Sequence, residues 1–163
     1  MESENGRRIT HARIDRCLRD GSTTLDLSSL GLSEIPESLS DLTHLARLDL
    51  RENGLRQVPD SLGNLIALTE LNLSENYLSV LPDTLKNLTA LTRLNLSSPG
   101  MPAPEFFPAL GLTTLPECLG NLTSLTDLEL WNNRLTALPE SLGDLPDLTW
   151  INLSGNPIDT GDR

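Results

Sequence analysis

Leucines recur along this chain with a fixed period of 23 residues, and this period predicts a stack of short repeated units. The pattern is clearest over residues 45–65 and returns in the same register over 68–88. A further copy runs over 125–147, a last partial copy over 148–156, and an early copy begins near Ser22. Because several copies share one register, the period indicates a solenoid rather than a chance match.

Each period contains the signals of a strand, a turn and a short helical segment. The alternation Leu48-Asp49-Leu50 predicts a short strand with one buried face. Asn53 follows where the chain must turn, and its amide can point inward to pair backbone groups that the turn leaves without partners. A later proline suits the first position of a helical turn, and the acid after it suits the positive end of the turn's dipole. These acids are Glu37, Asp60, Asp83, Glu117 and Glu140.

The repeated pattern LxxLxLxxNxLxxLPxxLxxLxx resembles that of leucine-rich repeat proteins of the short cytosolic type. Plant Ras-group-related proteins, Ras-suppressor scaffolds, Roco proteins and bacterial effectors carry repeats of this kind. The resemblance covers nearly all of residues 22–163 and implies an α/β solenoid, a right-handed horseshoe segment. Its parallel concave sheet would have about six strands, with short helical or 3-10 turns on the convex side. It also implies a non-catalytic adaptor or scaffold that binds a protein or peptide.

Residues 1–21 are expected to form an N-terminal tail and a capping helix over the first repeat. The helix is predicted over 9–20, with Ile14, Cys17 and Leu18 on its buried face and a glycine placed to end it. The five arginines from Arg7 to Arg19 would then lie mostly on its outer side. That basic surface is either a solvated face or a site for an acidic partner.

No amphipathic cap follows the last partial copy, so its strand is expected to be an unprotected edge. Leu148, Ile151, Leu153 and Ile158 would each have only one neighbouring repeat. A second copy of the same chain is the simplest cover for this end. The alternative function is therefore a structural or regulatory homo-oligomer, assembled as a homodimer through the C-terminal repeat.

Function is expected on the concave face, whose outward positions form three rows that cross the strands. The first row consists of Thr24, Arg47, Glu70, Arg93, Asp127 and Trp150. The second row consists of Asp26, Asp49, Asn72, Asn95, Glu129 and Asn152. The third row consists of Ser28, Arg51, Ser74, Ser97, Trp131 and Ser154. The alternating signs in the first row predict a ladder of cross-strand ion pairs through Arg47, Glu70 and Arg93.

The two tryptophans are the strongest candidates for partner contacts, because a leucine core does not need them. Trp131 and Trp150 both fall in outward positions, and exposed aromatic side chains are frequent binding hot spots. Alternatively, the rings lie flat over neighbouring aliphatic stems or stabilise the last repeat.

An interrupted copy begins at Leu91 and places an insertion loop at about 98–111. Pro99 stands where the repeat should have its asparagine, and the loop contains Phe106 and Phe107. Loops held by a rigid scaffold often carry function, so these rings are candidates for contact with a partner. Alternatively, they fold back to fill the gap that the missing asparagine leaves.

The predicted partner-binding residues combine the rows, the tryptophans and the loop. They are Arg47, Arg51, Glu70, Arg93, Asp127, Glu129, Trp131, Trp150, Asn152, Phe106 and Phe107. Six strands about 4.8 Å apart, with about 17 Å of exposed residues along each strand, give a projected face of roughly 400 Å². A standard interface buries about 800 Å² per partner, so tight binding would have to recruit the loop, an edge or the C-terminal end.

Composition narrows the remaining classes of function. The net charge of −11 argues against nucleic acid, and no segment has the length of a membrane span. Cys17 and Cys118 are expected to be free thiols in a reducing compartment, so we expect a cytoplasmic protein. No spacing of metal ligands and no glycine loop for a cofactor phosphate is found. An enzyme that uses concave carboxylates is a remote alternative, because a shallow open face would not desolvate a substrate.

Overall fold

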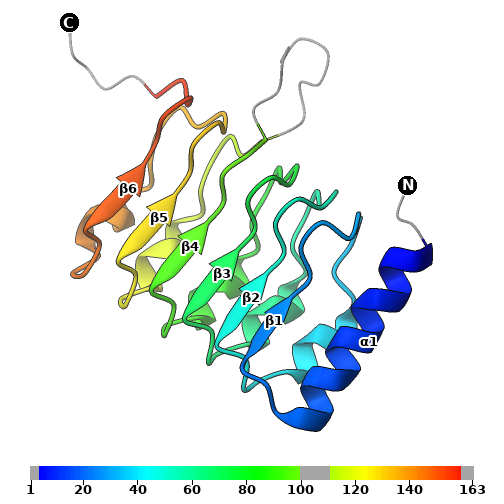
Figure 1. Ribbon diagram of the computed structural model, residues 1–163. Coiled ribbons are helices and arrows are strands. Elements are labelled where there is room, and N and C mark those ends of the chain that lie inside the picture. The colour runs from blue at the N-terminus through cyan, green and yellow to red at the C-terminus, as the bar shows by residue number, and fades with distance from the viewer. Residues whose placement is uncertain (1–3, 100–110, 159–163) are drawn as a thin grey trace, which may run out of the picture.

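The computed structural model describes residues 4–99 and 111–158 of the 163-residue chain. Within these ranges a helix, α1 (Glu4–Asp20), precedes six short strands that alternate with five 3-10 helices (Figure 1). The strands are β1 (Thr24–Asp26), β2 (Arg47–Asp49), β3 (Glu70–Asn72), β4 (Arg93–Asn95), β5 (Asp127–Glu129) and β6 (Trp150–Asn152). The 3-10 helices are η1 (Glu37–Asp41), η2 (Asp60–Asn64), η3 (Asp83–Asn87), η4 (Glu117–Asn121) and η5 (Glu140–Asp144).

The strands form one parallel sheet in chain order, which confirms the predicted solenoid. Equivalent positions of successive repeats are partners across the sheet, as Leu48 is with Leu25 on one side and Leu71 on the other. Thr69 Oγ1 donates to the carbonyl of Ala46, 23 residues earlier. The equivalent oxygen of Thr126 lies 3.0 Å from the carbonyl oxygen of Thr92, 34 residues earlier, so the extra length lies between these two residues. Most of that insertion, 100–110, lies outside the described residues.

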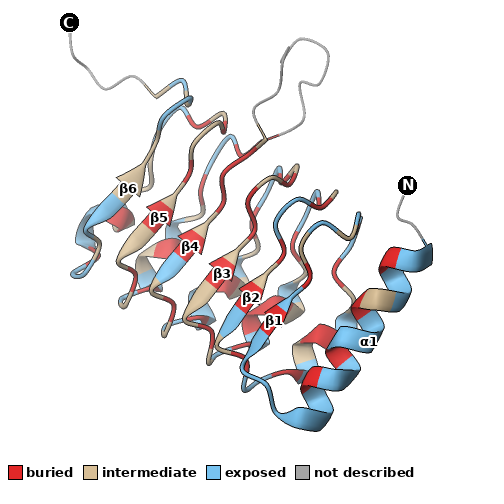
Figure 2. Ribbon diagram, viewed as in Figure 1, coloured by how far each residue is buried: buried red, intermediate tan, exposed pale blue. Residues whose placement is uncertain are grey.

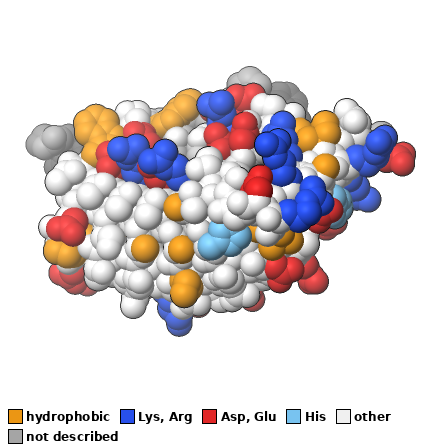
Figure 3. Space-filling model, turned by 60° about the horizontal axis from the view of Figure 1, so that its bottom comes forward, with side chains coloured by type: hydrophobic (Ala, Val, Ile, Leu, Met, Phe, Trp, Pro, Cys, Tyr) orange, Lys and Arg blue, Asp and Glu red, His pale blue; other side chains and the backbone are white. Residues whose placement is uncertain are grey.

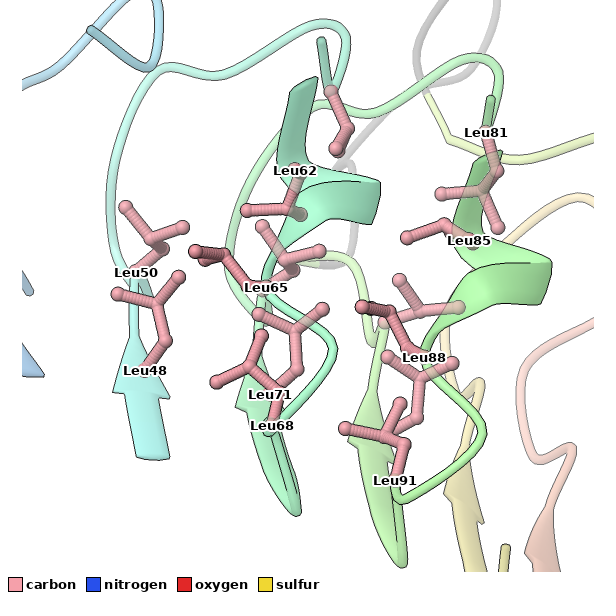
Figure 4. Packing of buried hydrophobic residues seen from close by; sticks show 14 of the residues in the cluster. Leu48, Leu50, Leu62, Leu65, Leu68, Leu71, Leu81, Leu85, Leu88 and Leu91 are labelled. Carbon is pink, nitrogen blue, oxygen red and sulfur yellow. The ribbon is translucent and has the colours of Figure 1, made fainter. Parts of the chain in front are cut away.

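The core is a continuous stack of leucines between the sheet and the 3-10 helices. Leu48, Leu50, Leu65, Leu68 and Leu71 are each no more than 2% exposed. Figure 4 shows these side chains pointing toward leucines of the neighbouring repeat. Burial of one such side chain contributes about 1.5–3 kcal/mol, and a repeat without its neighbours would leave these leucines in water.

Inward-pointing asparagines join the second, third, fifth and sixth repeats each to the one before it. Asn53 Oδ1 accepts hydrogen bonds from the backbone N–H groups of Leu30 and Leu32, at 3.1 and 3.0 Å. Its Nδ2 donates to the carbonyls of Leu27 and Leu50, both at 2.9 Å. The inward orientation predicted for Asn53 is therefore confirmed, and the equivalent asparagines are Asn76, Asn133 and Asn156.

The first repeat has Leu30 where later repeats have this asparagine. The asparagine serves backbone groups of the preceding repeat, and within residues 4–99 only α1 lies before the first repeat (Figure 1). A leucine is therefore sufficient there, and Leu30 packs against the core. Pro99 takes the position in the fourth repeat, as predicted.

Helix α1 covers the N-terminal end of the core, but it is longer than predicted and its buried face differs. It begins at Glu4 rather than at residue 9, because Gly6 and Thr10 extend the buried stripe of Ile14 and Cys17 by two turns. Thr10 Oγ1 donates to the Gly6 carbonyl at 2.9 Å, which allows a polar residue in this stripe. Leu18 was predicted to be buried and is 43% exposed, because the stripe continues through Cys17.

The end of α1 and its outer side agree with the prediction. Gly21 adopts φ +68° and its N–H donates to the Cys17 carbonyl at 3.0 Å, which ends the helix. The five arginines of α1 are exposed. Figure 3 shows basic side chains gathered at the end of the molecule that carries α1. One of them, Arg13, donates from Nη1 to the Asp26 carbonyl at 2.6 Å and so ties the helix to β1.

Each 3-10 helix starts with an acid, and the proline precedes it instead of occupying the first helical position. Pro59 keeps an extended ψ of 150°, and Asp60 is the first residue of η2. The same arrangement holds at η1, η3, η4 and η5. The prediction for the proline was therefore wrong by one position, whereas the acids do lie at the positive end of each turn.

The last repeat is less buried than the others. Figure 2 shows buried positions in the middle of β1 to β5 and none in β6. Leu148, Ile151, Leu153 and Ile158 are partly buried, as predicted for residues with one neighbouring repeat.

We expect replacement of Asn76 by alanine to lower the free energy of unfolding by about 2–4 kcal/mol. Asn76 is 2% exposed, and its Nδ2 donates to the carbonyls of Leu50 and Leu73, so the substitution leaves buried backbone groups without partners. Urea denaturation measures the change. Asn87→Ala is the control, because Asn87 is exposed at the end of η3 and should change stability by no more than about 0.5 kcal/mol. Equal effects of the two substitutions would contradict the role of the buried amide.

Two glycines at the same position of different repeats should respond oppositely to alanine. A Cβ on Gly63 would lie 2.5 Å from the Thr84 carbonyl oxygen in the next repeat, whereas a Cβ on Gly143 meets nothing within 4 Å. Gly63→Ala should therefore destabilise the protein by about 1–3 kcal/mol. Gly143→Ala should leave stability unchanged or raise it by up to about 1 kcal/mol. Thermal unfolding of the two variants tests this, and a Gly63→Ala protein as stable as the parent would refute the close packing of η2 on η3.

Candidate functional site

The outward side chains of the strands line a groove on the concave face, which we define as the sheet face that carries the three rows. The sheet register aligns the first row as predicted, with Arg47 beside Glu70, Arg93 beside Asp127 and Asp127 beside Trp150. The groove has a volume of about 470 Å³. Its polar lining side chains are Thr24, Asp26, Arg47, Asp49, Glu70, Asn72, Arg93, Asn95, Asp127 and Glu129. The face that was expected to be shallow thus has a groove across β1 to β5.

The predicted ion-pair ladder is present in the first row. Arg47 Nε lies 3.2 Å from Glu70 Oε1, and Arg93 Nη1 lies 3.7 Å from the same oxygen. The two arginine side chains are 61% and 66% exposed. Each pair therefore contributes only about 0–1 kcal/mol, and an incoming partner can replace it at little cost.

Most of the second row holds the ends of the strands in place. Asp26 Oδ1 accepts hydrogen bonds from the N–H and the hydroxyl of Ser28, at 2.8 and 2.7 Å. These bonds lower the pKa of the Asp26 carboxyl below its usual value. Asp49, Asn72, Asn95 and Asn152 accept the backbone N–H two residues later in the same way. Asn152, predicted to bind a partner, thus already has a structural role. The sequence signal for this structural role is an Asp or Asn two residues before a backbone N–H that its short side chain can reach.

Glu129 is the exception in the second row, because its longer side chain reaches the neighbouring strand. Its Oε1 accepts a hydrogen bond of 2.8 Å from the indole Nε1 of Trp150. Asp127, in the first row, accepts a bond of 2.6 Å at Oδ2 from the Thr126 hydroxyl. Both carboxylates are half-buried. The C-terminal end of the face thus has two acids held by uncharged donors and next to an aromatic ring.

The two tryptophans differ in exposure. Trp150 is 54% exposed, as predicted for an outward position, whereas Trp131 is only partly exposed. Trp131 follows β5, which has strands on both sides, whereas β6 has one neighbour within the described residues. Figure 2 shows the same contrast between these strands.

The structure brings the predicted first-row and second-row residues of β2 to β5 together in the groove and leaves other predicted residues outside it. Arg51 lies outside the groove lining, and its Nε is 3.5 Å from Asp49 Oδ2. Trp131, Trp150 and Asn152 also lie beyond the lining residues of the groove. Phe106 and Phe107 lie outside the described residues, so their role stays a prediction.

No group of three or more His, Cys, Asp or Glu side chains is placed to hold a metal ion in residues 4–99 and 111–158. In the same part of the chain, none of the helices has the length and apolar character needed to cross a bilayer.

Comparison with solved structures shows proteins built from the same repeat. YopM of Yersinia enterocolitica is 30% identical with a TM-score of 0.74, and the match covers 98% of this chain and 30% of YopM. A leucine-rich repeat protein of Leptospira interrogans is 29% identical with a TM-score of 0.59, over 81% of this chain and 37% of that one. The ectodomain of the Arabidopsis receptor kinase HAESA, solved in complex with an extended IDA peptide hormone, is 34% identical with a TM-score of 0.62.

The HAESA match covers 76% of this chain and 20% of that ectodomain. The chain thus spans only 20% to 37% of the length of these three structures. No curated protein is detectably similar to it. The family described as Leucine rich repeat matches residues 43–98 and 113–158, more than half of the sequence. The chain therefore belongs to the leucine-rich repeat family.

Proposed function

We propose that this chain is a protein-interaction module that binds a protein or peptide partner in the groove of its concave face. The observation that carries the proposal is the groove itself, about 470 Å³ in volume and lined by residues of five adjacent strands. Its exposed first-row side chains, Arg47 and Arg93, are held by weak surface ion pairs that a partner can replace. Solenoids commonly bind through such extended concave surfaces.

A structural neighbour supports this choice of partner class. The HAESA ectodomain was solved with a peptide hormone, and it shares the repeat fold with this chain. A face of roughly 400 Å² is smaller than the 800 Å² of a standard interface, so a peptide or a loop suits it better than a flat protein surface. We propose an adaptor or scaffold role on the same grounds.

We propose further that the module is not catalytic. Most acids and amides of the second row are occupied by backbone N–H groups, as Asp49 is by Arg51 and Asn95 by Ser97. Side chains that hold the strand ends are poorly suited to exchange protons with a substrate, because such movement would disrupt the turns. The acids of the groove that do not hold strand ends, Glu70, Asp127 and Glu129, are better explained by partner binding.

A cytoplasmic location is part of the proposal and rests on the two cysteines. Cys17 and Cys118 are both free thiols, and free cysteines persist in reducing compartments. Burial raises the pKa of both thiols above the usual value, so they stay protonated and unreactive near neutral pH.

Charge reversal in the groove should abolish partner capture. We expect Arg93→Glu to reduce capture of the specific partner from source-cell lysate at least about tenfold. The substitution places a carboxylate between Glu70 and Asp127 at the centre of the face, where binding hot spots cluster. Quantitative mass spectrometry of bound proteins measures the loss.

Arg56→Glu is the matched control, because Arg56 is exposed but lies outside the groove lining. This variant should retain the partner, and circular dichroism should show that both variants fold. If the two variants capture the same proteins in equal amounts as the parent, the groove is not the binding site.

A further inference from the structure

Charge is unevenly distributed along the concave face. In β2 and β3 each acid has a guanidinium within 4 Å, since Asp49 pairs with Arg51 and Glu70 pairs with Arg47. Arg93 stands beside Asp127 in the register, yet its ion pair is with Glu70 on the other side. Within the described ranges, Asp127 and Glu129 form no ion pair of their own. The face is thus balanced or basic over β2 to β4 and acidic at β5.

The two acids at β5 are positioned by uncharged donors. Thr126 Oγ1 donates to Asp127 Oδ2 at 2.6 Å, and Trp150 Nε1 donates to Glu129 Oε1 at 2.8 Å. A carboxylate can accept about four hydrogen bonds, so each acid keeps acceptor capacity for a ligand. Both stay half-buried and held in one orientation, which reduces the entropy lost when a cation binds.

An exposed ring completes this end of the face. Trp150 is the neighbour of Asp127 in the sheet register, and its indole is hydrogen-bonded to Glu129. The side chain is 54% exposed. The face of an indole attracts cations, and the attraction adds to that of nearby carboxylates.

We propose that Asp127, Glu129 and Trp150 bind an arginine side chain of a partner segment lying along the groove. This inference rests on the proposed function and names the chemistry of the partner. Two acids beside a flat ring match a planar guanidinium, which donates five hydrogen bonds in a fixed fork and stacks on aromatic faces. A lysine ammonium would satisfy the carboxylates as a point charge but would not stack in this way.

Repulsion sets where along the groove the arginine binds. Arg47 and Arg93 carry exposed guanidinium groups over β2 to β4, and Arg51 lies beside them. A cationic side chain is therefore disfavoured over these strands and favoured at β5 and β6. The charge pattern thus places the arginine of the partner segment at the β5 and β6 end of the groove.

Small probes test this site without the natural partner. We would titrate ¹⁵N-labelled protein with N-acetyl-arginine amide, N-acetyl-lysine amide and N-acetyl-citrulline amide, and follow the indole N–H signals of Trp150 and Trp131. The arginine compound should shift the Trp150 signal in a saturable manner and leave that of Trp131 nearly unchanged. Citrulline, which keeps the shape but lacks the charge, should bind at least about tenfold more weakly.

The double variant D127N/E129Q should lose the response to arginine. The control D60N/E140Q removes the same net charge from exposed acids at the starts of η2 and η5, and it should respond like the parent. Equal binding of citrulline would overturn the role of charge, and equal binding of lysine would overturn the assignment to a guanidinium. Loss of binding in both double variants would mean attraction by overall charge alone. Any of these results leaves the capture experiment with Arg93→Glu unaffected, so the two proposals fail separately.

Discussion

The buried asparagine is the interaction on which the rest of this structure depends. A chain that leaves a strand and turns over a leucine core carries backbone N–H and C=O groups into a dry region, where each needs a partner. Asn53 supplies an acceptor for Leu30 and Leu32 and donors for two carbonyls, one of which belongs to the preceding repeat. The same side chain thus closes its own turn and joins two repeats, which keeps the strands in register and the concave face continuous.

Much of the fold can be predicted from the sequence because the same interactions recur in each repeat. The 23-residue period gives the strands, the core leucines and the asparagines, since each recurs in the same local setting. The structure departs from the prediction where a segment, such as α1, does not belong to the repeats. Leu18 is exposed because the buried stripe of α1 follows Gly6, Thr10, Ile14 and Cys17, and a polar Thr10 joins that stripe only through its bond to the Gly6 carbonyl. Side-chain hydrogen bonds of this kind are not visible in a hydrophobic pattern.

The candidate site also has a part that the sequence predicts and a part that it does not. Register alone predicts which side chains share the concave face, and the ladder of Arg47, Glu70 and Arg93 follows from sign alternation. The sequence does not separate structural acids from available ones, because Asp49 and Glu129 occupy equivalent positions. The difference is one methylene group. The shorter side chain folds back to the N–H two residues later, whereas the longer one reaches Trp150 on the next strand. In the second row, side-chain length therefore decides which acid holds the end of its own strand and which reaches the neighbouring strand.

The exposure of Trp150 has two possible causes, and its hydrogen bond distinguishes them. β6 is the last strand of the described sheet, so a ring there could be exposed simply because no further repeat covers the edge. A ring that packed on such a repeat would extend away from β5. Trp150 instead donates from Nε1 to Glu129 on β5, which holds the indole over the concave side of the sheet. A molecule that covers this ring from the concave side therefore lies close to Glu129, so the aromatic and acidic parts of the proposed site are adjacent.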